Sequence, residues 1–393
     1  MPWMTDLYNN AVGFNARPLH QITIPGTHDA GCYVDHLYGN FQSRTQTQTI
    51  GQQLAGGIRY FDLRPYQANY VTGRSFWTFH GPFYTGGQID GPNGILAQIT
   101  NFMANLAPGD RELVILNFSH FNLKLNFSNA DHQALINTIT LALGNHLVPY
   151  TQAQINLFDA PYWQLLSNPA VGGGPPGVMG ATPQSSRVAI LYDGALDQNL
   201  EGYVTANVNA LPPGFFVISP KYAPAANPIF LFDQYSATGS LNILRANQID
   251  KLLNRANYPY STKAWAAAAG NWPPNAAGGV ASTLHLFSWT LTPQPYGDPI
   301  PAAANTSNPA LPGIFSVGTR VIDSAGSHHP CSGVDQWAAW NYDPANDPKI
   351  NILYVDHYTS HSYSNPASPL NGVPIPVAFA ARLNVGPIWP MTW

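Results

Sequence analysis

Six ionisable side chains lie at or near the ends of short, strongly apolar segments of this sequence. In chain order they are His28, Asp29, Asp62, Arg64, His80 and Asp356. An imidazole titrates near neutral pH and can act as a general acid or base, provided that a carboxylate fixes its tautomer. A guanidinium is a planar, permanently charged fork that matches the oxygens of a phosphate. The set therefore contains the groups needed for acid–base chemistry on a phosphodiester.

The stretch "ITIPGTHDAG" (22–31) has two interpretations when it is taken alone. An apolar run meets a Pro-Gly break and is followed directly by His28 and Asp29. Asp and Gly are common turn residues, so an ordinary structural turn has the same composition. The other segments favour a functional interpretation, since they too end on polar or charged residues.

The apolar segments have the composition of strands that are covered on both faces. They are "QITIPGTH" (21–28), "GIRYFDLR" (57–64), "FWTFHG" (76–81), "ELVILNFSHF" (112–121), "RVAILYD" (187–193), either "GFFVISP" (214–220) or "PIFLFDQY" (228–235), "TLHLFSWTL" (283–291) and "INILYVDHY" (350–358). Helical periodicity lies between several of these segments, over 93–109, 128–146 and 240–257. Ser128, followed three residues later by Asp131, has the pattern of a helix capping box.

About eight strands that alternate with helices predict an α/β fold, a (β/α)8 TIM-like barrel. The whole chain, 1–393, is expected to form this one domain, and a doubly wound open sheet is the alternative. Long loops are expected in four ranges rich in Pro, Gly and Asn: 164–186, 194–228, 258–282 and 292–349. Barrel strands end at one common face, so the six ionisable side chains are expected to converge there.

Three motifs carry a resemblance to a known family. In chain order, "IPGTHDAG", "GGIRYFDLRPY" and "FHGPFY" resemble the X domain of phosphatidylinositol-specific phospholipase C. "ELVILNFSHF" is similar to the fourth strand of the X-domain-only branch, and "FDQYSATGSLNILRANQIDKLL" and "ILYVDHY" resemble later strands of the bacterial enzymes. The resemblance is specific over 21–121, patchy over 187–260 and present again at 350–358. It implies an imperfect (β/α)8 barrel.

The resemblance also implies catalytic roles. His28 would be the general base on the inositol 2-hydroxyl, with Asp356 as its carboxylate partner. His80 would be the general acid on the diacylglycerol oxygen, with Asp29 beside it, so that His28 and Asp29 serve different partners rather than each other. Arg64 would bind the phosphate, and Asp62 would orient Arg64 or complete the site.

Headgroup contacts are expected at four further positions. Asp233 and Tyr235 fall where the bacterial enzymes bind and stack the inositol ring. Those enzymes place a lysine near the end of the fourth strand and an arginine at the end of the fifth. This chain has His120 and Asp193 near these places. The missing cations leave open a phosphodiesterase that acts on another headgroup.

No metal or other cofactor is expected. The calcium-using branch of the superfamily has Asn after its first histidine and an acid at the position of Arg64. Calcium needs several oxygen ligands at close range. Because this chain has Asp29 and Arg64 at the two positions, the guanidinium is expected to replace the ion.

The composition excludes several classes of partner. Charged residues make up only 9% of the chain and the net charge is −4, so there is no basic surface for nucleic acid. The resemblance implies a phospholipid at a membrane or micelle surface as the partner. No apolar run is long enough to span a bilayer, so the chain is expected to be a peripheral monomer. The first residues lack the pattern of a signal peptide, although low charge favours an extracellular setting. Cys32 and Cys331 fit no metal pattern and are either thiols or one disulfide.

Three functions remain open on the sequence. The first is an enzyme that cleaves phosphatidylinositol into diacylglycerol and a cyclic inositol phosphate. The second is a related phosphodiesterase for another headgroup, and the third is a catalytically silent lipid-headgroup-binding domain. Two histidines with carboxylate partners favour an enzyme, since binding alone does not need them.

Overall fold

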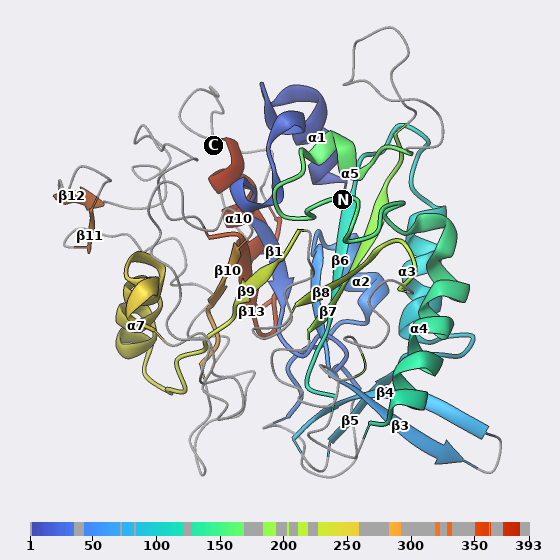
Figure 1. Ribbon diagram of the computed structural model, residues 1–393. Coiled ribbons are helices and arrows are strands. Elements are labelled where there is room, and N and C mark those ends of the chain that lie inside the picture. Colours follow the sequence, from blue (N-terminus) through green and yellow to red (C-terminus); the bar gives the residue numbers. More distant parts are fainter. Residues whose placement is uncertain are drawn as a thin grey trace, which may run out of the picture.

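The computed structural model describes most of the chain as a barrel with peripheral elements (Figure 1). The described residues are 2–34, 43–70, 73–81, 84–121, 127–168, 184–193, 203, 211–218, 227–258, 283–291, 319–322, 328–331, 350–360, 362 and 372–385. Within these ranges no helix is both long and apolar enough to cross a bilayer.

Eight strands form one sheet in which every pair of neighbours is parallel. In sheet order they are β8 (Phe215–Ile218), β7 (Arg187–Asp193), β6 (Leu113–Phe118), β2 (Tyr60–Leu63), β1 (Ile24–Thr27), β13 (Ile352–Val355), β10 (Thr283–Ser288) and β9 (Phe230–Phe232). A parallel bridge between Ile218 and Ile229 joins the two outer strands. The sheet therefore curls into a nearly closed barrel, which confirms the predicted fold and excludes an open sheet.

One predicted barrel strand is wrong. Residues 76–81 belong to an antiparallel three-stranded sheet of β3 (Pro65–Tyr70), β4 (Gly73–His80) and β5 (Tyr84–Gln88). The first half of β4 is exposed or half-buried, so its apolar second half is one end of a hairpin rather than a covered strand. The eighth barrel strand comes from the range 214–220, because this segment and 228–235 both form strands.

The three predicted helices are present as α3 (Ile95–Ala104), α4 (Asn129–Leu143) and α7 (Leu241–Leu253). Ser128 caps α4 in a complete capping box with Asp131, as its sequence predicts. The remaining helical elements are α1 (Trp3–Asn10), η1 (Phe14–Ala16), η2 (Leu19–Gln21), α2 (Ile50–Ala55), η3 (Gly144–His146), α5 (Tyr162–Leu165), η6 (Arg255–Asn257) and α10 (Ile375–Val385).

Two of the predicted loop ranges contain strands. β8 lies within 194–228, and a small antiparallel pair lies within 292–349, formed by β11 (Thr319–Ile322) and β12 (His328–Cys331). The other residues of 292–349, and most of 164–186 and 258–282, lie outside the described residues. Cys32 is buried, whereas the side chain of Cys331 is outside the described part.

The barrel interior needs a residue without a side chain at Gly26. A Cβ there would lie 2.9 Å from Tyr60 Cδ1 and 3.0 Å from Ile352 Cγ2. The Tyr60 ring and the Ile352 side chain occupy this space, and the Tyr60 ring also packs edge to face on Tyr354, with centroids 6.3 Å apart. The glycine of "IPGTH" is therefore explained by close packing inside the barrel.

Candidate active site

The sheet register places the candidate side chains on the inner face of the barrel. Gly26 pairs with Tyr60 on one side and with Tyr354 on the other. Side chains alternate along a strand, so His28, Asp62 and Asp356 follow these residues on the same face, one step nearer the carboxyl ends. Three neighbouring strands thus deliver an imidazole and two carboxylates to one mouth.

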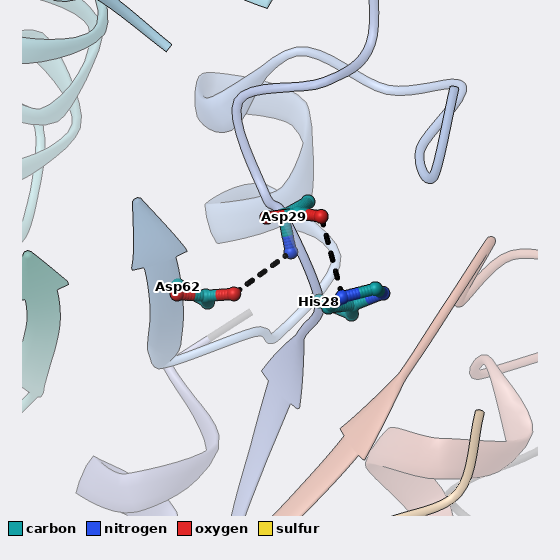
Figure 2. A group of neighbouring side chains, drawn as sticks. All are labelled: His28, Asp29 and Asp62. Atoms are coloured by element: carbon teal, nitrogen blue, oxygen red, sulfur yellow. Dashed lines mark hydrogen bonds and ion pairs between the residues drawn. The ribbon is translucent and has the colours of Figure 1, made fainter. Parts of the chain in front are cut away.

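Asp29 reaches the same mouth by a change in backbone direction. It directly follows His28, but its φ of 41° lies in the left-handed region, which aspartate tolerates better than most residues. The Asp29 amide donates a hydrogen bond to Asp62 Oδ2 at 3.3 Å, and the Asp29 carboxylate turns toward His28 (Figure 2). The turn at Asp29 therefore brings its carboxylate to the same mouth as His28 and Asp62.

Both nitrogens of His28 lie beside carboxylates. Nδ1 is hydrogen-bonded to Asp356 Oδ1 at 2.9 Å, and Nε2 lies 3.2 Å from Asp29 Oδ2. Nε2 also lies 3.0 Å from Arg64 Nη2. Burial lowers the pKa of His28, but the charges of Asp29 and Asp356 outweigh burial, so the pKa is raised above its usual value.

His80 approaches this group from β4 rather than from a barrel strand. Its Nδ1 is hydrogen-bonded to the Ser43 carbonyl oxygen at 3.0 Å, and its Nε2 lies 3.4 Å from Asp29 Oδ2. The rings of His28 and His80 have centroids 5.8 Å apart. Burial lowers the pKa of His80, and Asp29 only partly opposes this effect.

The expected division of the carboxylates between the histidines is therefore wrong in one respect. Asp356 is the partner of His28, as the resemblance implies. Asp29, however, lies beside both His28 and His80 through the same oxygen, Oδ2. The left-handed turn at Asp29 allows its carboxylate to sit between the two rings.

Arg64 links the carboxylates to the histidine. Its Nε forms an ion pair with Asp29 Oδ1 at 2.5 Å, and its Nη2 lies 3.4 Å from Asp62 Oδ2. Burial lowers the pKa of Arg64, but the charges of Asp29 and Asp62 outweigh burial. The pKa is therefore raised above its usual value, and the guanidinium stays charged. Since 16% of the side chain is exposed at the mouth, the charge is open to an anion.

Asp62 accepts several donors although it is almost completely buried. Ser119 Oγ donates to Asp62 Oδ1 at 3.1 Å, and the Tyr354 hydroxyl donates to Asp62 Oδ2. Burial raises the pKa of Asp62, but the charges of Arg64, His120 and His28 outweigh burial and bring the pKa to about 2. Asp62 is therefore a permanent anion behind Arg64.

The four expected headgroup residues take different positions. Asp233 and Asp193 lie at the ends of barrel strands. Burial and the charge of Asp62 raise the pKa of Tyr60 inside the barrel, and the charges of Asp233 and Asp193 raise it further. His120 is turned toward Ser119, with Nδ1 2.7 Å from Ser119 Oγ, and so lies next to the Asp62 network. Tyr235 is 65% exposed beyond the end of β9. Asp233 and His120 therefore lie close enough to interact with Asp62, Asp193 lies near Tyr60, and Tyr235 is exposed to solvent.

Burial and the charge of Asp62 raise the pKa of Asp233 to about 6. Asp193 is buried at the end of β7. The part of the mouth near β7 and β9 is therefore acidic.

Among the described residues, His28, Asp29 and Asp62 form a group whose ligand atoms lie within 4.8 Å of one another. A divalent cation would need this space, but the guanidinium of Arg64 contacts all three residues. Two positive charges at this distance would repel each other strongly in a site with low dielectric. The donor set therefore does not fit a divalent cation while Arg64 is in place.

Two further residues complete the site, and one of them, Tyr354, is not predicted from the sequence. Tyr354 packs its ring against His28, with centroids 5.2 Å apart, and binds Asp62 through its hydroxyl. Ser119 binds the other oxygen of Asp62. Tyr354 lies in an apolar strand and has the composition of a core residue. The available signal is its spacing of two from Asp356, which puts both side chains on one face.

Known proteins share parts of this chain and its fold. No family model matches the chain. "PI-PLC X domain-containing protein 3" of Danio rerio is 29% identical over 177 residues, 39% of this chain and 51% of the relative. "PI-PLC X domain-containing protein 2" of Mus musculus is 31% identical over 156 residues, 34% of this chain and 42% of the relative.

A bacterial protein has a shorter match. The "1-phosphatidylinositol phosphodiesterase" of Listeria monocytogenes is 32% identical over 88 residues, 22% of this chain and 25% of that protein. The chain thus spans about half the length, or less, of the curated relatives it matches.

The barrel itself has a counterpart among solved structures. A mutant of phosphatidylinositol-specific phospholipase C from Staphylococcus aureus superposes with a TM-score of 0.50 at 12% identity, over 96% of each chain. This similarity shows a shared fold. The sequence relatives are similar to the chain over 22% to 39% of its length, and two of them are named for a PI-PLC X domain.

Proposed function

We propose that the chain is a phosphodiesterase of the phospholipase C type that cleaves phosphatidylinositol between diacylglycerol and phosphate without a metal ion. The observation that carries this proposal is the arrangement around Asp29. One carboxylate lies beside two imidazoles and forms an ion pair with Arg64. A lipid-binding domain has no need for two histidines that face each other across a shared carboxylate. The Listeria relative, a phosphatidylinositol phosphodiesterase by name, adds support.

The contacts of His28 suit a general base. When Nδ1–H donates to Asp356, the Nε2 lone pair of the neutral ring accepts a hydrogen bond from Arg64 Nη2. Nε2 takes the proton of the inositol 2-hydroxyl as that oxygen attacks phosphorus. The resulting Nε2–H then faces Asp29 Oδ2, so both protonation states of the ring have a partner.

His80 suits the other half of the reaction. Its Nδ1–H donates to the Ser43 carbonyl, which leaves Nε2 to carry the transferable proton. As the bond from phosphorus to the diacylglycerol oxygen breaks, His80 Nε2–H protonates that oxygen. The products are diacylglycerol and a cyclic inositol phosphate, and water can open the cyclic ester in a second step.

Arg64 takes the place of a metal ion in this scheme. Its charged fork stabilises the negative charge that develops on the phosphate oxygens. Since Arg64 lies among His28, Asp29 and Asp62, it supplies the positive charge where a cation would otherwise bind.

A second candidate is a phosphodiesterase of the same type for another headgroup. The observation that favours it is the acidic part of the mouth at Asp193 and Asp233. Carboxylates accept hydrogen bonds from hydroxyls, as the ring of inositol requires, but they also suit a headgroup that carries an ammonium group. The two candidates share the catalytic groups and differ only in this part of the mouth.

The test is phosphorus NMR of phosphatidylinositol in mixed micelles with the protein and excess chelator. A new cyclic phosphodiester resonance is expected with the unmodified protein. His28→Ala and His80→Ala should each abolish it while leaving the thermal midpoint nearly unchanged. His146→Ala, on the short helix η3, is the matched control and should retain the activity.

A product from another phospholipid alone would select the second candidate. Absence of product from every phospholipid, with and without calcium, would refute the enzyme and favour a silent binding domain. The micelle surface is part of the proposal, because a peripheral protein meets its lipid there.

A further inference from the structure

Tyr354 makes two contacts with the site that no catalytic step described above uses. Its hydroxyl donates to Asp62 Oδ2, and its ring packs against the ring of His28 at a centroid distance of 5.2 Å. Only 7% of the residue is exposed, so both contacts are shielded from water. A tyrosine that served the core alone would not need to place its hydroxyl on the carboxylate behind the phosphate-binding arginine.

Tyr354 remains a donor at the pH at which histidines work. Burial raises the pKa of Tyr354 well above its usual value, and the charge of Asp62 raises it further, so the phenol stays protonated. A buried carboxylate is costly unless donors surround it. Tyr354 supplies one such donor, Ser119 Oγ supplies a second, and the Asp29 amide supplies a third.

Asp62 in turn limits where Arg64 can lie. The guanidinium has an ion pair with Asp29 at one edge and lies 3.4 Å from Asp62 Oδ2 at Nη2. This same Nη2 contacts His28 Nε2. If Asp62 lost its hydroxyl donors, it would draw the nearest cationic group toward itself, and the nearest such group is Nη2 of Arg64. The guanidinium would then move away from His28 and from a phosphate at the mouth.

We propose that Tyr354, with Ser119, is a positioning residue of the phosphodiester site, which acts through Asp62 to hold Arg64 where it meets His28 and the phosphate. Neither hydroxyl touches substrate in this assignment. The inference rests on the proposed function for its effect on turnover, but its effect on phosphate binding does not depend on that function.

The experiment compares three single variants with the unmodified protein. Tyr354→Phe removes the hydroxyl and keeps the ring that packs on His28. Tyr60→Phe is the matched control, because Tyr60 is also a buried tyrosine of the barrel and its hydroxyl makes no hydrogen bond to Asp62 or Arg64 among the described contacts. Asp62→Asn removes the charge through which Tyr354 is proposed to act, and a Tyr354→Phe/Asp62→Asn double variant completes the cycle.

Two readouts are measured for each variant, namely kcat and KM on phosphatidylinositol micelles and the dissociation constant of inorganic phosphate by calorimetry. A lost hydrogen bond to a charged group corresponds to about a 10-fold or larger fall. Tyr354→Phe should therefore lower kcat/KM and phosphate affinity by about 10-fold, and Tyr60→Phe should change both less than twofold. In the Asp62→Asn background the Tyr354→Phe change should have little further effect.

Equal effects of Tyr354→Phe and Tyr60→Phe, or full additivity with Asp62→Asn, would overturn the assignment. If Tyr354→Phe does not fold, Ser119→Ala removes the other hydroxyl donor and is expected to lower phosphate affinity in the same non-additive way. Failure of the unmodified protein to cleave phosphatidylinositol would refute the proposed function alone. The phosphate cycle would still decide the role of Tyr354.

Discussion

Replacement of Arg64 by lysine keeps the positive charge of this residue and removes the planar fork of the guanidinium. The guanidinium reaches Asp29 Oδ1 at 2.5 Å, His28 Nε2 at 3.0 Å and Asp62 Oδ2 at 3.4 Å. A lysine ammonium has one nitrogen, so it cannot make both the Nε contact with Asp29 and the two Nη2 contacts with His28 and Asp62. Each lost contact involves a charged partner and is worth about 1.5 to 3 kcal/mol. Loss of one of them corresponds to a fall in kcat/KM of roughly 10- to 10²-fold.

The assay is the initial rate of phosphatidylinositol cleavage in mixed micelles with excess chelator, together with the thermal midpoint of each variant. Arg64→Lys keeps the positive charge beside two buried carboxylates, so the fold should persist. Arg74→Lys is the control, since Arg74 lies on β4 and pairs with Asp131 outside the site. A kcat/KM for Arg64→Lys within about threefold of the unmodified protein would refute the forked phosphate contact.

Three further predictions concern metal dependence, pH dependence and stability. Activity should survive excess EDTA, because Arg64 supplies the positive charge of the site; loss that calcium restores would contradict this. The pH profile of kcat/KM should be bell-shaped and include pH 6.5. Burial lowers the pKa of His80 below this value, and the carboxylates hold the pKa of His28 above it. A profile that falls on only one side, acidic or basic, would show that one of the two histidines takes no part in the mechanism. Glu112→Gln should cost about 3 to 5 kcal/mol of unfolding free energy in urea, because it breaks a fully buried ion pair with Arg59; a change below about 1 kcal/mol would show that the pair is not needed.

The residues at barrel strand ends are the part of the site that sequence predicts best. His28, Asp62 and Asp356 each follow an apolar run, and parallel strands of one barrel must end at one face. Their convergence therefore follows from the fold class alone. His80 converges too, but from a hairpin, because the apolar half of β4 has the composition of a barrel strand while its first half lies in solvent.

Contacts that depend on one backbone angle or on packing are not visible in the sequence. The position of the Asp29 carboxylate between the two rings follows from a left-handed φ of 41°, and many His-Asp pairs occur without that angle. Tyr354 looks like a core aromatic, and its contact with Asp62 depends on the register of β13 against β1 and of β1 against β2.

The protonation of the two imidazoles shows why Asp29 matters to both. Burial lowers the pKa of His80, while the carboxylates beside His28 hold its pKa up against burial. One proton shared by the pair therefore resides on His28 in the free protein, whereas the proposed reaction needs it on His80. Asp29 Oδ2 lies 3.2 Å from one Nε2 and 3.4 Å from the other, so the same carboxylate stabilises the proton at either ring. A phosphodiester held by Arg64 adds negative charge at the mouth and favours protonation of the ring nearest the leaving oxygen. The proposed reaction therefore depends on the substrate to bring the proton to His80, and Asp29 Oδ2 lies beside Nε2 of whichever ring carries it.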